Sequence, residues 1–199
     1  MERVNLKDLH LTYDAGNLQT RRATDMIVLH HTGNPTDDDL SAEEINASHQ
    51  AQGWTCIGYH YVVRKDGTIE VGRPHWTIGA HAAGENSHTI GIHVCGNFEI
   101  GYPTAAQIEA MAMAVTALAD GLWLTIDKAR ILTHGEAADN EDGVRAHAPY
   151  GPRSICERWD LEYLGTHESP AFRPWAEDGT RGGDVLRGKA AFYRELWKR

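Results

Sequence analysis

Strand-like and helix-like patterns alternate along most of this chain, and this alternation restricts the possible folds more than any other feature. Short runs rich in apolar and β-branched residues predict strands at 26–29, 59–64, 68–71, 89–95 and 130–133. Helix start signals at Ser41 and Thr104, and an apolar stripe from Asp184 onward, predict helices between and after them. Interleaved signals of this kind predict an α/β domain with a central sheet.

Local motifs mark the ends of several elements. Ser41 is followed by Glu44, and Thr104 by Gln107, three residues later in each case, which is the capping-box pattern of a helix start. The first of these helices is expected to end near Gly53. The Lys65-Asp66-Gly67 segment between two strand-like runs predicts a β-hairpin.

The predicted elements and the local composition divide the chain into three parts. Residues 1–25 are predicted to be a lead-in, 26–165 the main domain, and 166–199 a C-terminal extension. A polar, Gly- and Pro-rich stretch at 135–155 predicts an irregular loop. In the extension, one helical stripe is expected to pack on the main domain, and it consists of Leu186, Ala190, Tyr193 and Trp197.

Composition narrows the possible partners. The chain has 199 residues, of which 41% are hydrophobic and 24% charged, as in ordinary globular domains. Its net charge of −9 gives no basic face for phosphates, so we expect no nucleic-acid partner. No run approaches the roughly 20 apolar residues of a membrane span, so stable membrane insertion is not expected.

The N-terminus and the cysteines indicate the compartment. Residues 1–25 contain no apolar core of a signal peptide, which predicts synthesis in the cytoplasm. Three scattered cysteines do not form a disulfide framework, and Cys56 and Cys95 are expected to be small buried residues. We also expect Trp54 and Trp76 to pack in the core, with stacking on a sugar as the alternative.

Histidines are unusually frequent, with 12 in the chain. His30 directly follows the strand-like run 26–29, and His134 follows 130–133, so both stand where a sheet holds metal ligands toward solvent. Successive side chains of a strand point to opposite faces, so His30 and His31 cannot both reach one metal. For any single histidine, an ordinary polar residue at a strand end is the alternative interpretation.

A series of short blocks gives these histidines a family context. The chain resembles the zinc-dependent N-acetylmuramoyl-L-alanine amidases of the phage and bacterial type, whose fold the animal peptidoglycan-recognition proteins share. The resemblance covers roughly residues 25–165, and the order and spacing of its blocks match. The matching blocks are 28–32, 53–54, 57–61, 66–68, 72–73, 79–82, Asn86, 89–92 and 133–134.

The resemblance implies a mixed β-sheet flanked by helices and a Zn²⁺ ion with His, His and Cys or Asp ligands. It makes His30 and His134 ligands and turns His31 to the interior. The family's last ligand ends a Lys-x-Cys or Lys-x-Asp segment, which this chain lacks at the usual spacing. Asp160 in Arg158-Trp159-Asp160 is the first candidate. The alternatives are Cys156, His147 and Asp142.

The resemblance also implies catalytic and substrate-binding residues. Tyr59 and a lysine position that Arg158 occupies here would stabilise the oxyanion. Arginine cannot release a proton near neutral pH, so another group must protonate the leaving amine. His93 is a candidate, because it stands where one branch of the family has a catalytic Glu. His81 and Asn86 match positions that line the substrate groove.

The implied activity is hydrolysis of the bond between N-acetylmuramic acid and L-alanine in peptidoglycan. Without a signal peptide, the chain fits a phage or prophage endolysin, expected to be a monomer that reaches the cell wall after release with the help of a holin. Two alternatives stay open, namely a non-catalytic peptidoglycan-binding module of the same fold and a cytoplasmic amidase that recycles small muropeptides.

Overall fold

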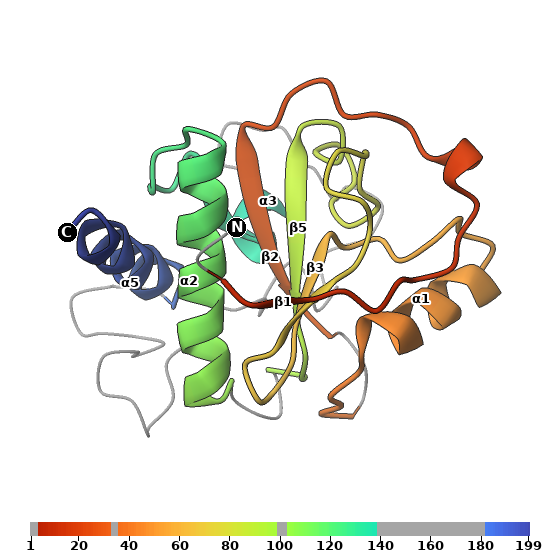
Figure 1. The fold of residues 1–199 in the computed structure, drawn as a ribbon, viewed down its shortest axis with the longest axis horizontal. Helices are drawn as coiled ribbons and strands as arrows, with labels where there is room; N and C mark the ends of the chain where they lie inside the picture. Colours follow the sequence, from red (N-terminus) through yellow and green to blue (C-terminus); the bar gives the residue numbers. More distant parts are fainter. Residues whose placement is uncertain (1–3, 33–35, 99–102, 139–181) are drawn as a thin grey trace.

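A six-stranded sheet forms the centre of the molecule (Figure 1). The computed structural model describes residues 4–32, 36–98, 103–138 and 182–199. The strand order is β1-β4-β3-β5-β2-β6; only the β3–β4 hairpin is antiparallel, so the sheet is mixed, as the resemblance implies. Its strands are β1 (Leu6–Lys7), β2 (Met26–His31), β3 (Tyr61–Val63), β4 (Ile69–Val71), β5 (Thr89–Val94) and β6 (Ile131–Thr133).

Helices cover both faces of this sheet. They are α1 (Ala42–Ala51), α2 (Ala105–Gly121), α3 (His134–Ala138) and α5 (Gly182–Trp197), with a short 3₁₀ turn at Ala15–Asn17. The helices α2 and α5 lie side by side against one face, and α1 packs on the other (Figure 1). No helix in the described part of the chain combines the length and the apolar character that crossing a bilayer requires.

The predicted helix starts are confirmed in atomic detail. The Ser41 hydroxyl accepts from the backbone N–H of Glu44 at 3.2 Å, and the Glu44 carboxylate accepts from the backbone N–H of Ser41 at 2.7 Å. Thr104 and Gln107 make the same reciprocal pair at the start of α2. Each pair satisfies two backbone donors that a helix terminus otherwise leaves without partners.

Alternation along β2 separates the core from the site. Ile27 and Leu29 belong to the main core with α2 and α5. The ring of His31 stacks on Phe98, also in this core, and its Nδ1 accepts from the Phe98 backbone N–H at 3.0 Å. His31 therefore faces the interior as predicted, and His30 points to the opposite face, where α1 lies.

The C-terminal helix packs on the main domain as expected. Leu186 and Ala190 are buried in the main core, and Tyr193 and Trp197 are partly buried against it. Arg194 adds polar contacts, since it pairs with Asp120 at 2.7 Å and donates to the Leu124 carbonyl at 2.9 Å. The predicted boundary near residue 166 lies outside the described residues.

Three expectations need revision, and one is confirmed. The predicted lead-in contributes β1, which pairs with β4, and the start of the predicted loop 135–155 is helical in α3. The prediction that both tryptophans pack in the core is wrong, since Trp54 is 40% exposed and Trp76 is 54% exposed. Cys56 and Cys95 are fully buried, as predicted.

His60 holds backbone groups in place inside the fold. His60 is fully buried; its Nδ1 accepts from the Gly91 backbone N–H, and its Nε2 donates to the Thr77 carbonyl, both at 3.0 Å. Burial lowers the pKa of His60 from 6.5 to about 3. Protonation of Nδ1 would also place two N–H groups against each other, so the fold requires the neutral ring.

This requirement predicts acid sensitivity. Between the folded pKa of about 3 and the ordinary value of 6.5, unfolding takes up a proton at His60. The free energy of unfolding therefore rises with pH in this window, and the contribution of His60 is complete above pH 6.5 and lost toward pH 3.

Denaturant unfolding from about pH 4 to pH 6 measures this effect. His60→Gln should reduce the slope of the unfolding free energy against pH by about 1.4 kcal/mol per unit. An unchanged slope in the variant would show that His60 does not titrate on unfolding.

Candidate metal centre and active site

Two histidines from distant parts of the chain meet at one edge of the sheet. The parallel strands β2 and β6 pair Leu29 with Thr133, so the residues that follow, His30 within β2 and His134 at the start of α3, lie next to each other. Their Nδ1 atoms are 2.8 Å apart, and their ring centroids are 4.2 Å apart. Both side chains are buried, so nearly all of their polar interactions are made inside the protein.

A chain of hydrogen bonds behind His30 sets which of its nitrogens carries the proton. The Thr89 hydroxyl donates to the Glu85 carbonyl at 2.8 Å, so its oxygen accepts from Nε2–H of His81 at 3.3 Å. Nδ1 of His81 then accepts from Nε2–H of His30 at 2.9 Å. In this arrangement Nδ1 of His30 keeps its lone pair and directs it at His134.

Two glycines make room for His81. A Cβ added at Gly91 would lie 2.5 Å from the His81 ring, and one added at Gly79 would also collide with it. The Asn86 side-chain oxygen accepts from the backbone N–H groups of His81 and Ala82 at 2.8 and 2.9 Å. These contacts place His81 and Asn86 in support of His30, and their contact with substrate stays a prediction.

Tyr59 stands directly beside His30, with 5.2 Å between the ring centroids. The ring of His93 also lies 4.6 Å from that of Tyr59, and His93 pairs with His30 across β2 and β5. His93 Nε2 contacts the Thr32 hydroxyl at 2.9 Å. Burial lowers the pKa of His93 from 6.5 to about 3, so its ring is neutral near neutral pH.

An exposed aromatic residue extends the site toward solvent. The ring centroids of His49 and Tyr59 are 5.9 Å apart. The indole of Trp54, which is half-exposed, lies 4.4 Å from the His49 ring, centroid to centroid. Nδ1 of His49 accepts from the Gly58 backbone N–H at 3.0 Å, which fixes this ring. The exposed Trp54 indole thus offers a flat apolar surface close to Tyr59.

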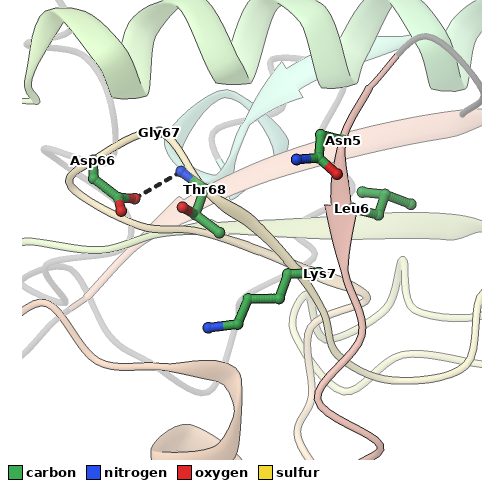
Figure 2. A pocket seen from close by; sticks show the side chains of 6 residues that line it. All are labelled: Asn5, Leu6, Lys7, Asp66, Gly67 and Thr68. Atoms are coloured by element: carbon green, nitrogen blue, oxygen red, sulfur yellow. Dashed lines mark hydrogen bonds between the residues drawn. The ribbon is translucent and has the colours of Figure 1, made fainter.

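A separate pocket lies away from these histidines. Figure 2 shows this space of about 540 Å³ between β1 and the β3–β4 turn, lined by Asn5, Leu6, Lys7, Asp66, Gly67 and Thr68. Asp66 already accepts from the Thr68 backbone N–H at 2.8 Å. None of the histidines described above lines this pocket, so it is not part of the candidate site.

Comparison with known proteins identifies the family. The family model of N-acetylmuramoyl-L-alanine amidases matches residues 20–151. The chain belongs to this amidase family. The match contains His30, His134 and all of the sheet except β1, and it ends before α5.

Individual relatives of this amidase-family chain support the assignment. An endolysin of Enterobacteria phage K11 is 32% identical over 119 residues, which span 59% of this chain and 79% of the relative. The structure of the amidase LysC from Clostridium intestinale URNW superposes with a TM-score of 0.61 at 32% identity, covering 69% of this chain and 87% of that one. Drosophila PGRP-LB, at 22% identity and a TM-score of 0.57 over 69% of this chain and 86% of its own, shares the fold.

The paired histidines of this family member fit a zinc ion. Imidazole nitrogens are common zinc ligands, and two of them on a tetrahedral ion lie about 3.3 Å apart. The observed 2.8 Å between the Nδ1 atoms differs from this by about half an ångström. Within the described ranges, no three His, Cys, Asp or Glu side chains group into a metal site. Arg158 and the candidates for a third ligand, Asp160, Cys156, His147 and Asp142, lie outside those ranges.

The support that His81 gives to His30 was not predicted, although the sequence contains a signal for it. Gly91 interrupts a strand of otherwise larger residues, and a glycine inside a strand often marks close approach of another group. Here that group is the His81 ring. What the pattern could not supply is the identity of the approaching residue.

Gly79 and Gly91 together form a cradle for the His81 ring. Gly91→Ala tests whether this cradle controls the tautomer of His30. The added methyl group collides with the His81 ring, so the hydrogen bond from His30 should be lost and the free energy of unfolding should fall by about 1–3 kcal/mol. ¹⁵N NMR of the histidine rings should show His30 changing from one tautomer to a mixture. Gly188→Ala is the control, because a Cβ there meets nothing within 4 Å. An unchanged His30 tautomer in Gly91→Ala would contradict the role of the cradle.

Proposed function

We propose that this amidase-family chain is a zinc-dependent enzyme that hydrolyses the amide bond between N-acetylmuramic acid and L-alanine in bacterial peptidoglycan. The observation that carries the proposal is the pair of Nδ1 atoms of His30 and His134, 2.8 Å apart at the ends of two parallel strands. The family match and the similarity to a phage endolysin support the choice of substrate.

His30 and His134 would hold the metal through Nδ1, and Asp160 is proposed as the third ligand. When bound, zinc activates water for attack on an amide carbonyl and polarises that carbonyl. The His81–Thr89 chain supports this role, because it keeps the proton of His30 on Nε2 and directs the Nδ1 lone pair at His134. Asp160 follows Arg158 by two residues, so in an extended segment both would face the metal.

Tyr59 is proposed to stabilise the oxyanion that forms when the carbonyl is attacked. Its ring lies beside His30, so its hydroxyl can reach a substrate held there. Arg158 is proposed to hold the same oxyanion as a fixed cation. His93 is proposed to relay a proton from the attacking water to the leaving amine, because burial keeps its ring neutral near neutral pH before this step.

The biological setting is proposed to be that of an endolysin. We infer synthesis in the cytoplasm of an infected cell, release to the wall with the help of a holin, and action as a monomer. The relative from phage K11 carries the name endolysin, which supports this setting. The exposed Trp54 would lie on the side that meets the glycan. Substrate binding by His81 and Asn86 is proposed from the resemblance alone.

Removal of either histidine ligand tests the proposal. His30→Ala and His134→Ala should each abolish binding of stoichiometric zinc and lower the release of new L-alanine amino termini from purified cell walls by at least about 10³-fold. A chelator should do the same to the wild type, and added zinc should restore it. His10→Asn is the matched control, since the His10 side chain is 87% exposed and pairs with Asp8.

Two outcomes would contradict the proposed enzymatic activity. Full activity in either ligand variant would place the chemistry elsewhere. Tight wall binding by a wild-type protein that takes up no zinc would instead favour the non-catalytic binding module.

A second test concerns Tyr59. Tyr59→Phe removes only the hydroxyl, so kcat should fall by about 10²-fold while zinc content and KM change little. Tyr61→Phe is the control, because its hydroxyl contacts His75 at 2.8 Å and its ring lies in the main core. Equal loss of activity in both variants would reduce the role of Tyr59 to packing.

A further inference from the structure

Among the described strands, the one that precedes His134 has a neighbour on one side only. This strand, β6, is three residues long and pairs with β2. Its outer edge would leave backbone groups of Ile131 and Thr133 without a strand partner. An edge so short gives little rigidity to the residue that follows it.

Two side chains satisfy this outer edge. Arg187 of α5 donates from one terminal nitrogen to the Ile131 carbonyl at 2.8 Å. The Glu136 carboxylate accepts from the Thr133 backbone N–H at 2.9 Å. Arg187 and Glu136 also bind each other through two parallel hydrogen bonds of 2.8 and 2.9 Å. Together they make the hydrogen bonds that a further strand would otherwise make along this edge.

The first turn of α5 is shaped around this pair. A Cβ at Gly183 would lie 2.8 Å from one oxygen of Glu136, so a larger residue there would displace this carboxylate from its present position. Asp184 adds a hydrogen bond of 2.6 Å from Arg187. The side chains of Arg187 and Glu136 are only 7% and 9% exposed, so the ion pair is shielded from water. A shielded bidentate pair holds its geometry better than a surface pair.

We propose that Arg187 is a positioning residue for His134. Through Glu136 and the Ile131 carbonyl, it fixes the end of β6 and the start of α3, and thereby the direction in which His134 presents Nδ1 to His30. The inference rests on the proposed metal site. It assigns a task to the C-terminal extension, because α5 lies beyond the residues that match the amidase family.

Metal affinity measures this role without relying on activity. Arg187→Met should weaken binding of Co²⁺ and Zn²⁺ by about 10-fold or more, as loss of supporting contacts around a ligand does. The Co²⁺ absorption spectrum should change in shape as well, because the ligand geometry changes. Arg187→Lys keeps the charge but loses the bidentate contact, so its metal affinity should lie between those of the wild type and of Arg187→Met.

Arg194→Met separates positioning from helix anchoring. Arg194 lies on the same helix and also makes an ion pair and a carbonyl hydrogen bond, but with Asp120 and Leu124 at the end of α2. Both variants should lower the melting temperature of the metal-free protein. Only Arg187→Met should weaken the metal affinity by more than about twofold.

Each outcome bears on the inference. If Arg187→Met does not fold, Glu136→Gln, which keeps the size of the side chain, takes its place and should show the same loss of affinity. Wild-type affinity in the folded variant, or equal losses in the Arg187 and Arg194 variants, would overturn the positioning role alone. Absence of metal binding by the wild type would overturn both this inference and the proposed function.

Discussion

The parallel pairing of β2 with β6 is the constraint on which the candidate site depends. Parallel strands end at the same edge of a sheet, so the residues that follow Leu29 and Thr133 become neighbours although they are 104 positions apart in the sequence. Alternation along β2 then decides which of the two adjacent histidines faces His134. His30 does so, while the ring of His31 stacks on Phe98 in the core.

Elements encoded by local patterns could be predicted from the sequence. The two capping boxes and the Asp66-Gly67 turn depend on residues three or fewer positions apart, and the structure confirms the helices and the hairpin that they indicate. β1 could not be predicted, because a two-residue strand exists only through its pairing with β4. The exposure of Trp54 was missed for the same reason, since burial depends on what packs against a residue.

In the candidate site, too, local patterns indicated some residues but not the long-range contacts between them. Positions after predicted strands, together with the family resemblance, indicated His30 and His134, and the structure brings them together. The contacts that support them join residues far apart in the chain, such as His30 with His81 and Glu136 with Arg187. No periodic pattern links such pairs. Asp160 as the third ligand stays a prediction.

The environment of each imidazole distinguishes structural histidines from candidate ligands better than their number does. Nδ1 of His31, His49 and His60 accepts from a backbone N–H, which uses the lone pair that a metal would need. Nδ1 of His30 faces another imidazole nitrogen instead. Two such atoms can share at most one proton, whereas a cation between them satisfies both lone pairs. Among the described residues, the fold therefore uses Nδ1 of His31, His49 and His60 to hold backbone, whereas His30 and His134 converge as the proposed metal ligands.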